Sequence, residues 1–139
     1  MESMVASTVT THVTGQGLGN PHQWVFKKSH STELVLVRIT EDWRRALDKG
    51  HVVGVVFVDF RKAFGAIPHS ILLRKLQSLG VAEDVRCWIR DYLSGRTQVA
   101  TVNGCQSLAL SVTFGVPQGS VLGPPLFSLF CNDLPNITE

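Results

Sequence analysis

The amino-acid sequence predicts a single domain of the α/β (α+β) class. Three features support this prediction: an apolar, β-branched run at residues 52–58, segments of helical periodicity on both sides of it, and an Asn-Gly hairpin signal at residues 103–104. The chain has 139 residues, of which 44% are hydrophobic and 17% are charged, as is typical of a globular domain. A formal net charge of +2 neither indicates nor excludes a polyanionic partner.

The N-terminal segment, residues 1–22, is expected to be a disordered tail rich in Ser, Thr and Gly, because it lacks sustained periodicity. Its first 20 residues contain no Lys or Arg, which excludes a basic-headed signal peptide and an Arg-rich transit peptide. Residues 23–139 form the expected domain. No apolar run approaches the roughly 20 residues that a membrane span requires, so no membrane association is expected.

Three cysteines stand far apart without metal-ligand spacing: Cys87, Cys105 and Cys131. They are expected to be reduced thiols, which indicates an intracellular protein of the cytoplasm or nucleus.

The first expected helix runs from Ser31 to Gly50. Its apolar side chains recur at steps of three or four residues: Leu36, Ile39, Trp43 and Ala46. The charged residues on its other faces fit a solvated surface better than a binding stripe. Residues 52–58 follow, and their apolar character on both faces predicts a strand buried in the middle of a sheet.

Two helices, a hairpin and a last helix are expected after this strand. One helix begins at Ser70 and ends at Gly80, with Leu72, Leu76 and Leu79 directed inward. The next opens with Glu83 and Asp84, ends near Gly95, and directs Val85, Trp88, Ile89 and Tyr92 inward. A hairpin is expected at residues 96–112, a Gly- and Pro-containing loop at residues 115–120, and a helical segment at residues 126–134.

Asp59 is the first candidate functional residue, because it directly follows the apolar run. A carboxylate in this position loses hydration unless a cation or hydrogen-bond donors contact it. On spacing alone, Asp59 fits either a carboxylate that caps a turn or pairs with Arg61 or Lys62, or a metal ligand. A magnesium site would require at least one more acid close in space.

The loop at residues 115–119 is the second candidate. Its backbone amides and the Gln118 side chain can hydrogen-bond a sugar or a phosphate, although a plain turn explains the same composition. The five histidines show no ligand spacing, and Ser120 lies outside a Gly-x-Ser-x-Gly elbow, so hydrolase chemistry has little support.

Five blocks of the sequence form a recognisable series. They are residues 23–32, 57–64, 69–72, 92–98 and 115–124. Together they resemble, in the same order, the reverse transcriptase of non-LTR (LINE-like) retrotransposons, over roughly residues 23–135. The resemblance implies a partial right-hand polymerase fold, the palm plus part of the fingers. It also implies an RNA-directed DNA polymerase, a nucleotidyltransferase that uses Mg²⁺, an RNA template, a DNA primer and deoxynucleotides.

The same resemblance implies roles for individual residues. Asp59 would be the catalytic palm aspartate and a metal ligand, and the Phe60 carbonyl would face a second metal. Residues implied in nucleotide binding are Lys27, Lys62, Ala63, Phe64, Gln118 and Gly119. The amides near Lys62 and Ala63 would meet the triphosphate, Phe64 would exclude a ribose 2′-hydroxyl, and Gln118 with Gly119 would line the nucleotide pocket. Lys27 stands where the family usually has a nucleotide-contacting arginine.

The chain also departs from the family pattern. Gly65 stands where an aspartate is usual, and the sequence reaches Glu139 without an aromatic-x-Asp-Asp motif. We therefore expect a truncated polymerase fragment that is inactive on its own, because one carboxylate cannot hold two Mg²⁺ ions. The alternative is a non-catalytic RNA- or protein-binding module derived from the same fold. Without the Asp-Asp hairpin, residues 52–58 are expected to form an exposed edge strand through which the chain self-associates.

Overall fold

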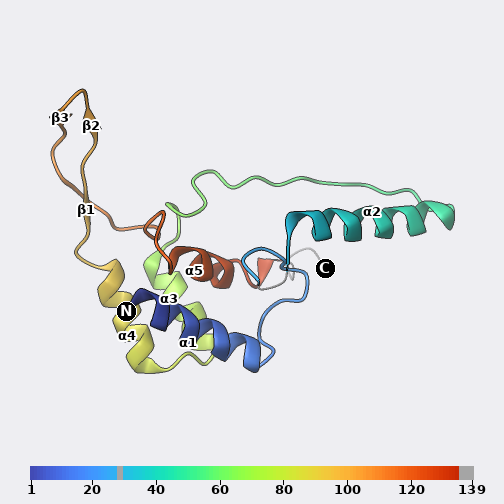
Figure 1. Ribbon diagram of the computed structural model, residues 1–139, viewed down its shortest axis with the longest axis horizontal. Coiled ribbons are helices and arrows are strands. Elements are labelled where there is room, and N and C mark those ends of the chain that lie inside the picture. The colour runs from blue at the N-terminus through green and yellow to red at the C-terminus, as the bar shows by residue number, and fades with distance from the viewer. Residues whose placement is uncertain (28–29, 135–139) are drawn as a thin grey trace.

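A computed structural model describes residues 1–27 and 30–134 of the chain (Figure 1). Four helices form its body: α1 (Glu2–Gly15), α3 (His69–Ser78), α4 (Glu83–Leu93) and α5 (Gly123–Phe130). Helix α3 packs against both α4 and α5. Helix α2 (Thr32–Asp48) and a β-hairpin extend from opposite sides of this body. This mixture of helices and strands agrees with the expected α+β class.

The hydrophobic core lies among the four helices of the body. Its most buried side chains are Val9 of α1, Leu72 and Leu76 of α3, Ile89 and Leu93 of α4, Leu126 of α5, and Ile67 and Leu122 from loops. Leucines four residues apart in α3 lie on one face, as the periodicity predicts. The predictions of α3 and α4 from periodicity and stop signals are therefore confirmed.

Helix α1 corrects the expectation that residues 1–22 are disordered. Its buried side chains, Ala6, Val9 and Val13, recur at steps of three and four residues and belong to the core. The His12 Nε2 atom also lies 2.9 Å from the Leu79 carbonyl oxygen at the end of α3. The Thr and Val residues of α1 have modest helix propensity, so tertiary packing rather than local preference stabilises this helix.

Replacing Val9 with alanine is expected to lower the free energy of unfolding by about 1–3 kcal/mol, because Val9 is 1% exposed and the variant leaves a cavity. Urea denaturation followed by circular dichroism measures this change. The exposed neighbour Ser7 provides the control, and Ser7→Ala is expected to change stability by less than about 0.5 kcal/mol. Equal effects of the two substitutions would mean that α1 does not pack in the core.

Helix α2 confirms the prediction of a helix beginning after Ser31, whose Oγ atom accepts a hydrogen bond from the Leu34 amide at 3.3 Å. Its surface carries ion pairs around Glu41, whose pKa is lowered to about 2 by hydrogen bonds from Arg44 and then Arg45. No side chain of α2 is fully buried.

The extended segment at residues 52–58 corrects the prediction of a buried central strand. It leads back from the end of α2 as an extended trace in Figure 1, and it pairs with no strand in the described part of the chain. Val56 and Phe57 are 87% and 88% exposed. A β-branched run favours the extended conformation, but a strand also requires hydrogen bonds from a neighbour, and none of the described strands lies beside it. The expected exposure of this segment agrees with the structure, but the expected edge strand is not formed among the described residues.

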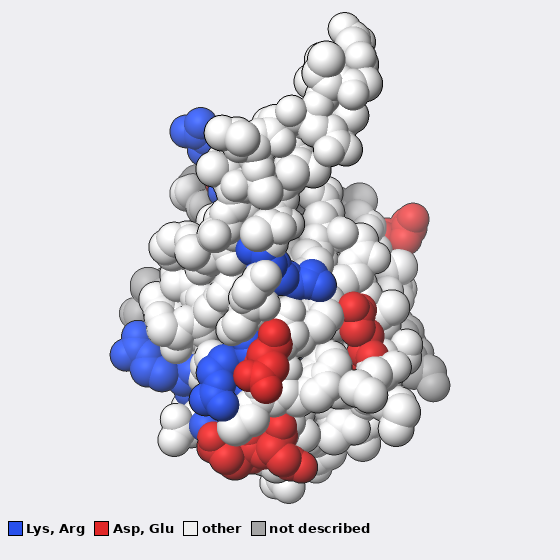
Figure 2. Space-filling model, turned by 90° about the vertical axis from the view of Figure 1, so that its left-hand side faces the viewer, with Lys and Arg blue, Asp and Glu red and all other residues white. Residues whose placement is uncertain are grey.

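The predicted hairpin is confirmed. Strand β1 (Thr97–Gln98) pairs antiparallel with β4 (Leu110–Ser111), and β2 (Thr101–Val102) pairs with β3 (Cys105–Gln106). Asn103 and Gly104, at the tip, both have positive φ angles, 50° and 79°, as a type I′ turn requires. No charged residue occurs between residues 97 and 132, and the projecting arm in Figure 2 is accordingly white.

Among the described helices, none combines the length and the apolar character needed to cross a membrane.

Candidate functional site

Two segments that are distant in the sequence are joined at the base of the hairpin. The Gly115 amide donates a hydrogen bond to the Ile67 carbonyl, and the Val116 amide donates one to the Phe64 carbonyl, both at 2.8 Å. The His69 Nε2 atom lies 2.7 Å from the Gly115 carbonyl oxygen. These contacts bring two blocks of the sequence pattern, residues 57–64 and 115–124, against each other.

Gly115 makes this close approach possible. A Cβ atom at this position would lie 2.7 Å from the Gly65 Cα atom and 2.8 Å from the Phe64 carbonyl oxygen. The φ angle of Gly115 is +85°, a conformation that side chains with a Cβ atom rarely adopt. A glycine is therefore required here by both space and backbone geometry.

A hollow of about 490 Å³ opens between this junction and the base of the hairpin. Phe64 and Gln118, two of the candidate nucleotide-binding residues, line it. Hydroxyl and amide side chains supply most of its other polar groups: Thr97, Gln98, Ser111 and Thr113. Arg96 also lines it, although the sequence patterns assigned this residue no role. The volume is within the range of small-molecule sites.

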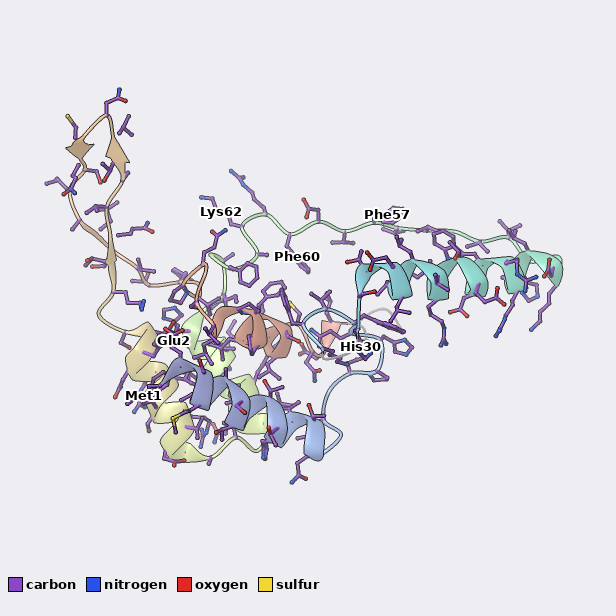
Figure 3. All side chains as sticks on the ribbon, in the orientation of Figure 1. Met1, Glu2, His30, Phe57, Phe60 and Lys62 are labelled. Carbon is purple, nitrogen blue, oxygen red and sulfur yellow. The ribbon has the colours of Figure 1, made fainter. Side chains whose placement is uncertain are left out.

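An aromatic cluster fixes the turn at residues 60–64 on helix α5. The centroids of the Phe64 and Phe127 rings lie 4.9 Å apart, and those of Phe60 and Phe127 lie 6.4 Å apart. Phe60 therefore points toward α5, whereas Lys62 is exposed and points away from the body (Figure 3). Lys62 has a positive φ angle of 55°, which is uncommon outside glycine.

Asp59 lies in the extended segment, exposed to solvent. It forms no ion pair with Arg61 or Lys62, so the pairing that the sequence left open as one alternative is absent. Within residues 1–27 and 30–134, no three His, Cys, Asp or Glu side chains gather as a metal site would require. The donor set around Asp59 therefore does not fit a complete Mg²⁺ site, which needs more than one oxygen ligand from the protein or substrate.

The remaining candidates lie outside the hollow. The Lys27 Nζ atom donates a hydrogen bond to the Asn20 carbonyl at 2.5 Å, beside a smaller hollow that Ser128 of α5 also lines. Lys62, Ala63 and Gly119 are not among the residues that line the larger hollow.

A sequence model of a family described as "Reverse transcriptase (RNA-dependent DNA polymerase)" matches residues 1–139, including α1. The "RNA-directed DNA polymerase from mobile element jockey" of Drosophila funebris is 38% identical over 114 residues, which cover 82% of this chain and 12% of that protein. The "Probable RNA-directed DNA polymerase from transposon BS" of Drosophila melanogaster is 33% identical over 134 residues, 96% of this chain and 15% of that protein.

A "Retrovirus-related Pol polyprotein from type-1 retrotransposable element R2" of Popillia japonica is 38% identical over 81 residues, which cover 58% of this chain and 11% of that protein. The chain thus spans less than a sixth of the length of each of these relatives. No solved structure matches the chain with statistical significance.

Proposed function

Because this chain belongs to the reverse transcriptase (RNA-dependent DNA polymerase) family, we propose that it forms the part of an RNA-directed DNA polymerase that receives the incoming nucleotide. The reaction adds deoxynucleotides to a DNA primer on an RNA template. The observation that carries the proposal is the junction at Gly115, which brings Phe64 and Gln118 to one hollow. In this proposal the chain is the palm with part of the fingers.

The residues on the hollow bind and select the nucleotide. Gln118 offers an amide that can donate to or accept from the sugar, and Phe64 presents a ring that excludes a 2′-hydroxyl by its bulk. Because Phe64 packs on Phe127, its ring position is held by α5. The Phe64 ring is therefore in place before the nucleotide arrives, which reduces the entropic cost of binding.

The other candidates keep their roles in the proposal on motif position alone. Lys62 and Ala63 supply amides to the triphosphate, Gly119 lines the nucleotide pocket, and Lys27 contacts the nucleotide from the fingers. Asp59 would contribute one carboxylate, and Phe60 its carbonyl, toward Mg²⁺ ions that the described residues alone do not hold.

The isolated chain is expected to show no primer extension above background, since Asp59 alone cannot hold two Mg²⁺ ions. Primer extension with the purified chain, an RNA template, deoxynucleotides and Mg²⁺ measures this. Extension that disappears in Asp59→Ala would overturn the expectation of inactivity.

A chimera tests the proposed function itself. In the chimera, this chain replaces the matching segment of the jockey polymerase of Drosophila funebris. We expect primer extension, and a loss of at least about a hundredfold in Asp59→Ala. Asp91→Ala is the control, because the Asp91 side chain is 82% exposed on α4 and, among the described residues, forms an ion pair only with Arg90, at 3.9 Å. A folded but inactive chimera would instead favour a non-catalytic binding module.

Three cysteine thiols, none in a disulfide, support our proposal that the polymerase works inside the cell, in the cytoplasm or nucleus.

A further inference from the structure

Arg96 is held in place where α4 leads into the hairpin. Its Nε atom donates a hydrogen bond to the Tyr92 carbonyl at 3.0 Å, and its guanidinium carbon lies 4.7 Å from the centre of the Tyr92 ring. That ring stacks on Trp88, with 5.3 Å between centroids and 11° between planes. These contacts use Nε and one face of the guanidinium. Both terminal nitrogens have no hydrogen-bond partner within the described part of the chain.

The charge of Arg96 is not neutralised at the hollow. Arg96 is the one charged side chain among the described residues that line it. It forms no ion pair with a described acid. Burial, more than the nearby Glu2 carboxylate, raises the pKa of Tyr92. Glu2 accepts a hydrogen bond from the Val121 amide and does not line the hollow. Arg96 is therefore the single source of side-chain charge among the described residues that line the hollow.

The rest of the lining suits the neutral parts of a nucleotide. Hydroxyl and amide groups of Thr97, Gln98 and Thr113 can hydrogen-bond a sugar or a base edge. Phe114, which is 56% exposed, offers a ring on which a base can stack. A volume of about 490 Å³ is sufficient for one small ligand rather than a duplex.

We propose that Arg96 is a phosphate-binding residue of this hollow, which takes one phosphate-bearing nucleotide unit, either free or within a single strand. The two terminal guanidinium nitrogens can donate parallel hydrogen bonds to one phosphate, a geometry that lysine cannot provide. This inference rests on the proposed function and adds to it a residue, Arg96, and the group of the nucleotide that it contacts, a phosphate. It also gives a role to the sequence block at residues 92–98, which the proposed function leaves unused.

Binding measurements on the chain itself test the proposal. The probes are a short fluorescein-labelled oligothymidine, followed by anisotropy, and dTTP, followed by calorimetry. Arg96→Gln is expected to weaken binding on the order of tenfold. For the oligothymidine it should also reduce the salt dependence of log K by about 0.7, as the loss of one phosphate contact predicts. Arg96→Lys should recover part of the affinity.

The matched control is Arg74→Gln, which removes the same charge from an exposed position on α3 outside the hollow. This control is expected to leave both affinities unchanged. If Arg96→Gln does not fold, NMR of the unaltered chain tests the same contact. The side-chain resonances of Arg96, but not those of Arg74, should shift when either probe is added.

The two probes distinguish the two possible sources of the phosphate. Weaker binding of the oligothymidine alone would identify a strand phosphate as the ligand, and weaker binding of dTTP alone would identify the triphosphate. Equal effects of Arg96→Gln and Arg74→Gln, unshifted Arg96 resonances, or no binding of either probe would overturn the proposal. An active chimera together with unaltered binding by Arg96→Gln would overturn this site alone. A folded but inactive chimera together with weakened binding by Arg96→Gln would overturn the proposed function and leave the phosphate contact of Arg96 standing.

Discussion

Replacing Gly115 with alanine is expected to lower the free energy of unfolding by on the order of 3 kcal/mol or more. Two costs combine. The new Cβ atom would lie within 3 Å of three backbone atoms, at Gly65 and Phe64, which cannot move as the end of a side chain can. The φ angle of +85° also strains any residue other than glycine. Relief of the clash would break the hydrogen bonds from residues 115 and 116 to the opposite segment.

Gly95→Ala separates these two costs. Gly95 also has a positive φ angle, +65°, but a Cβ atom there would meet nothing within 4 Å. Its replacement is expected to cost only the backbone strain, about 1–2 kcal/mol. Urea denaturation of both variants and the unaltered chain measures the difference. Equal losses at the two glycines would show that the segments at residues 64–67 and 115–116 are not in close contact.

The elements that could be predicted from the sequence are those stabilised by local signals. Helices α3 and α4 have apolar side chains at helical spacing and a glycine soon after the last turn, and the hairpin has the Asn103-Gly104 turn that a type I′ geometry favours. Each of these signals lies within about twenty residues of chain, so no knowledge of distant partners is required.

The elements that were predicted wrongly depend on distant partners. Residues 52–58 have the composition of a buried strand, yet a strand forms only where another chain segment completes its hydrogen bonds. Residues of α1 are predicted to be disordered but form a helix. The weak periodicity of Ala6, Val9 and Val13 stabilises this helix only because the other elements of the core offer an apolar surface to these side chains. Local composition therefore predicts neither the unpaired state of residues 52–58 nor the helical state of α1.

In the candidate site, too, residues with local sequence signals could be predicted, and residues placed by distant contacts could not. The loop at residues 115–119 could be predicted from its glycines, and the structure brings Phe64 and Gln118 to one hollow. The position of Arg96 on that hollow could not be predicted, because it depends on how α4 ends and on the stacking of Arg96 against Tyr92. Lys27 was expected near the nucleotide, but its ammonium group contacts the Asn20 carbonyl. Its assignment stays a prediction.

The exposed segment at residues 52–58 is expected to make the isolated chain self-associate. Val52, Val56, Phe57 and Val58 are each at least 75% exposed. Burying such a side chain contributes roughly 1.5–3 kcal/mol. The summed contribution of these four side chains is comparable with the 5–15 kcal/mol that stabilises a typical domain. Burial of the segment against another copy would therefore stabilise the associated state strongly. The backbone of this segment also has no strand partner in the described chain, which favours pairing with another copy.

Val56→Lys tests this expectation, because a charge on an unpaired strand opposes edge-to-edge pairing. Sedimentation velocity at tens of micromolar is expected to show oligomers for the unaltered chain and a shift toward monomer for Val56→Lys. Leu108→Lys is the matched control: Leu108 is also 87% exposed, but it lies on the hairpin, so this variant should stay associated. A monomeric unaltered chain with a sharp unfolding transition, or equal dissociation of both variants, would show that residues 52–58 do not mediate association.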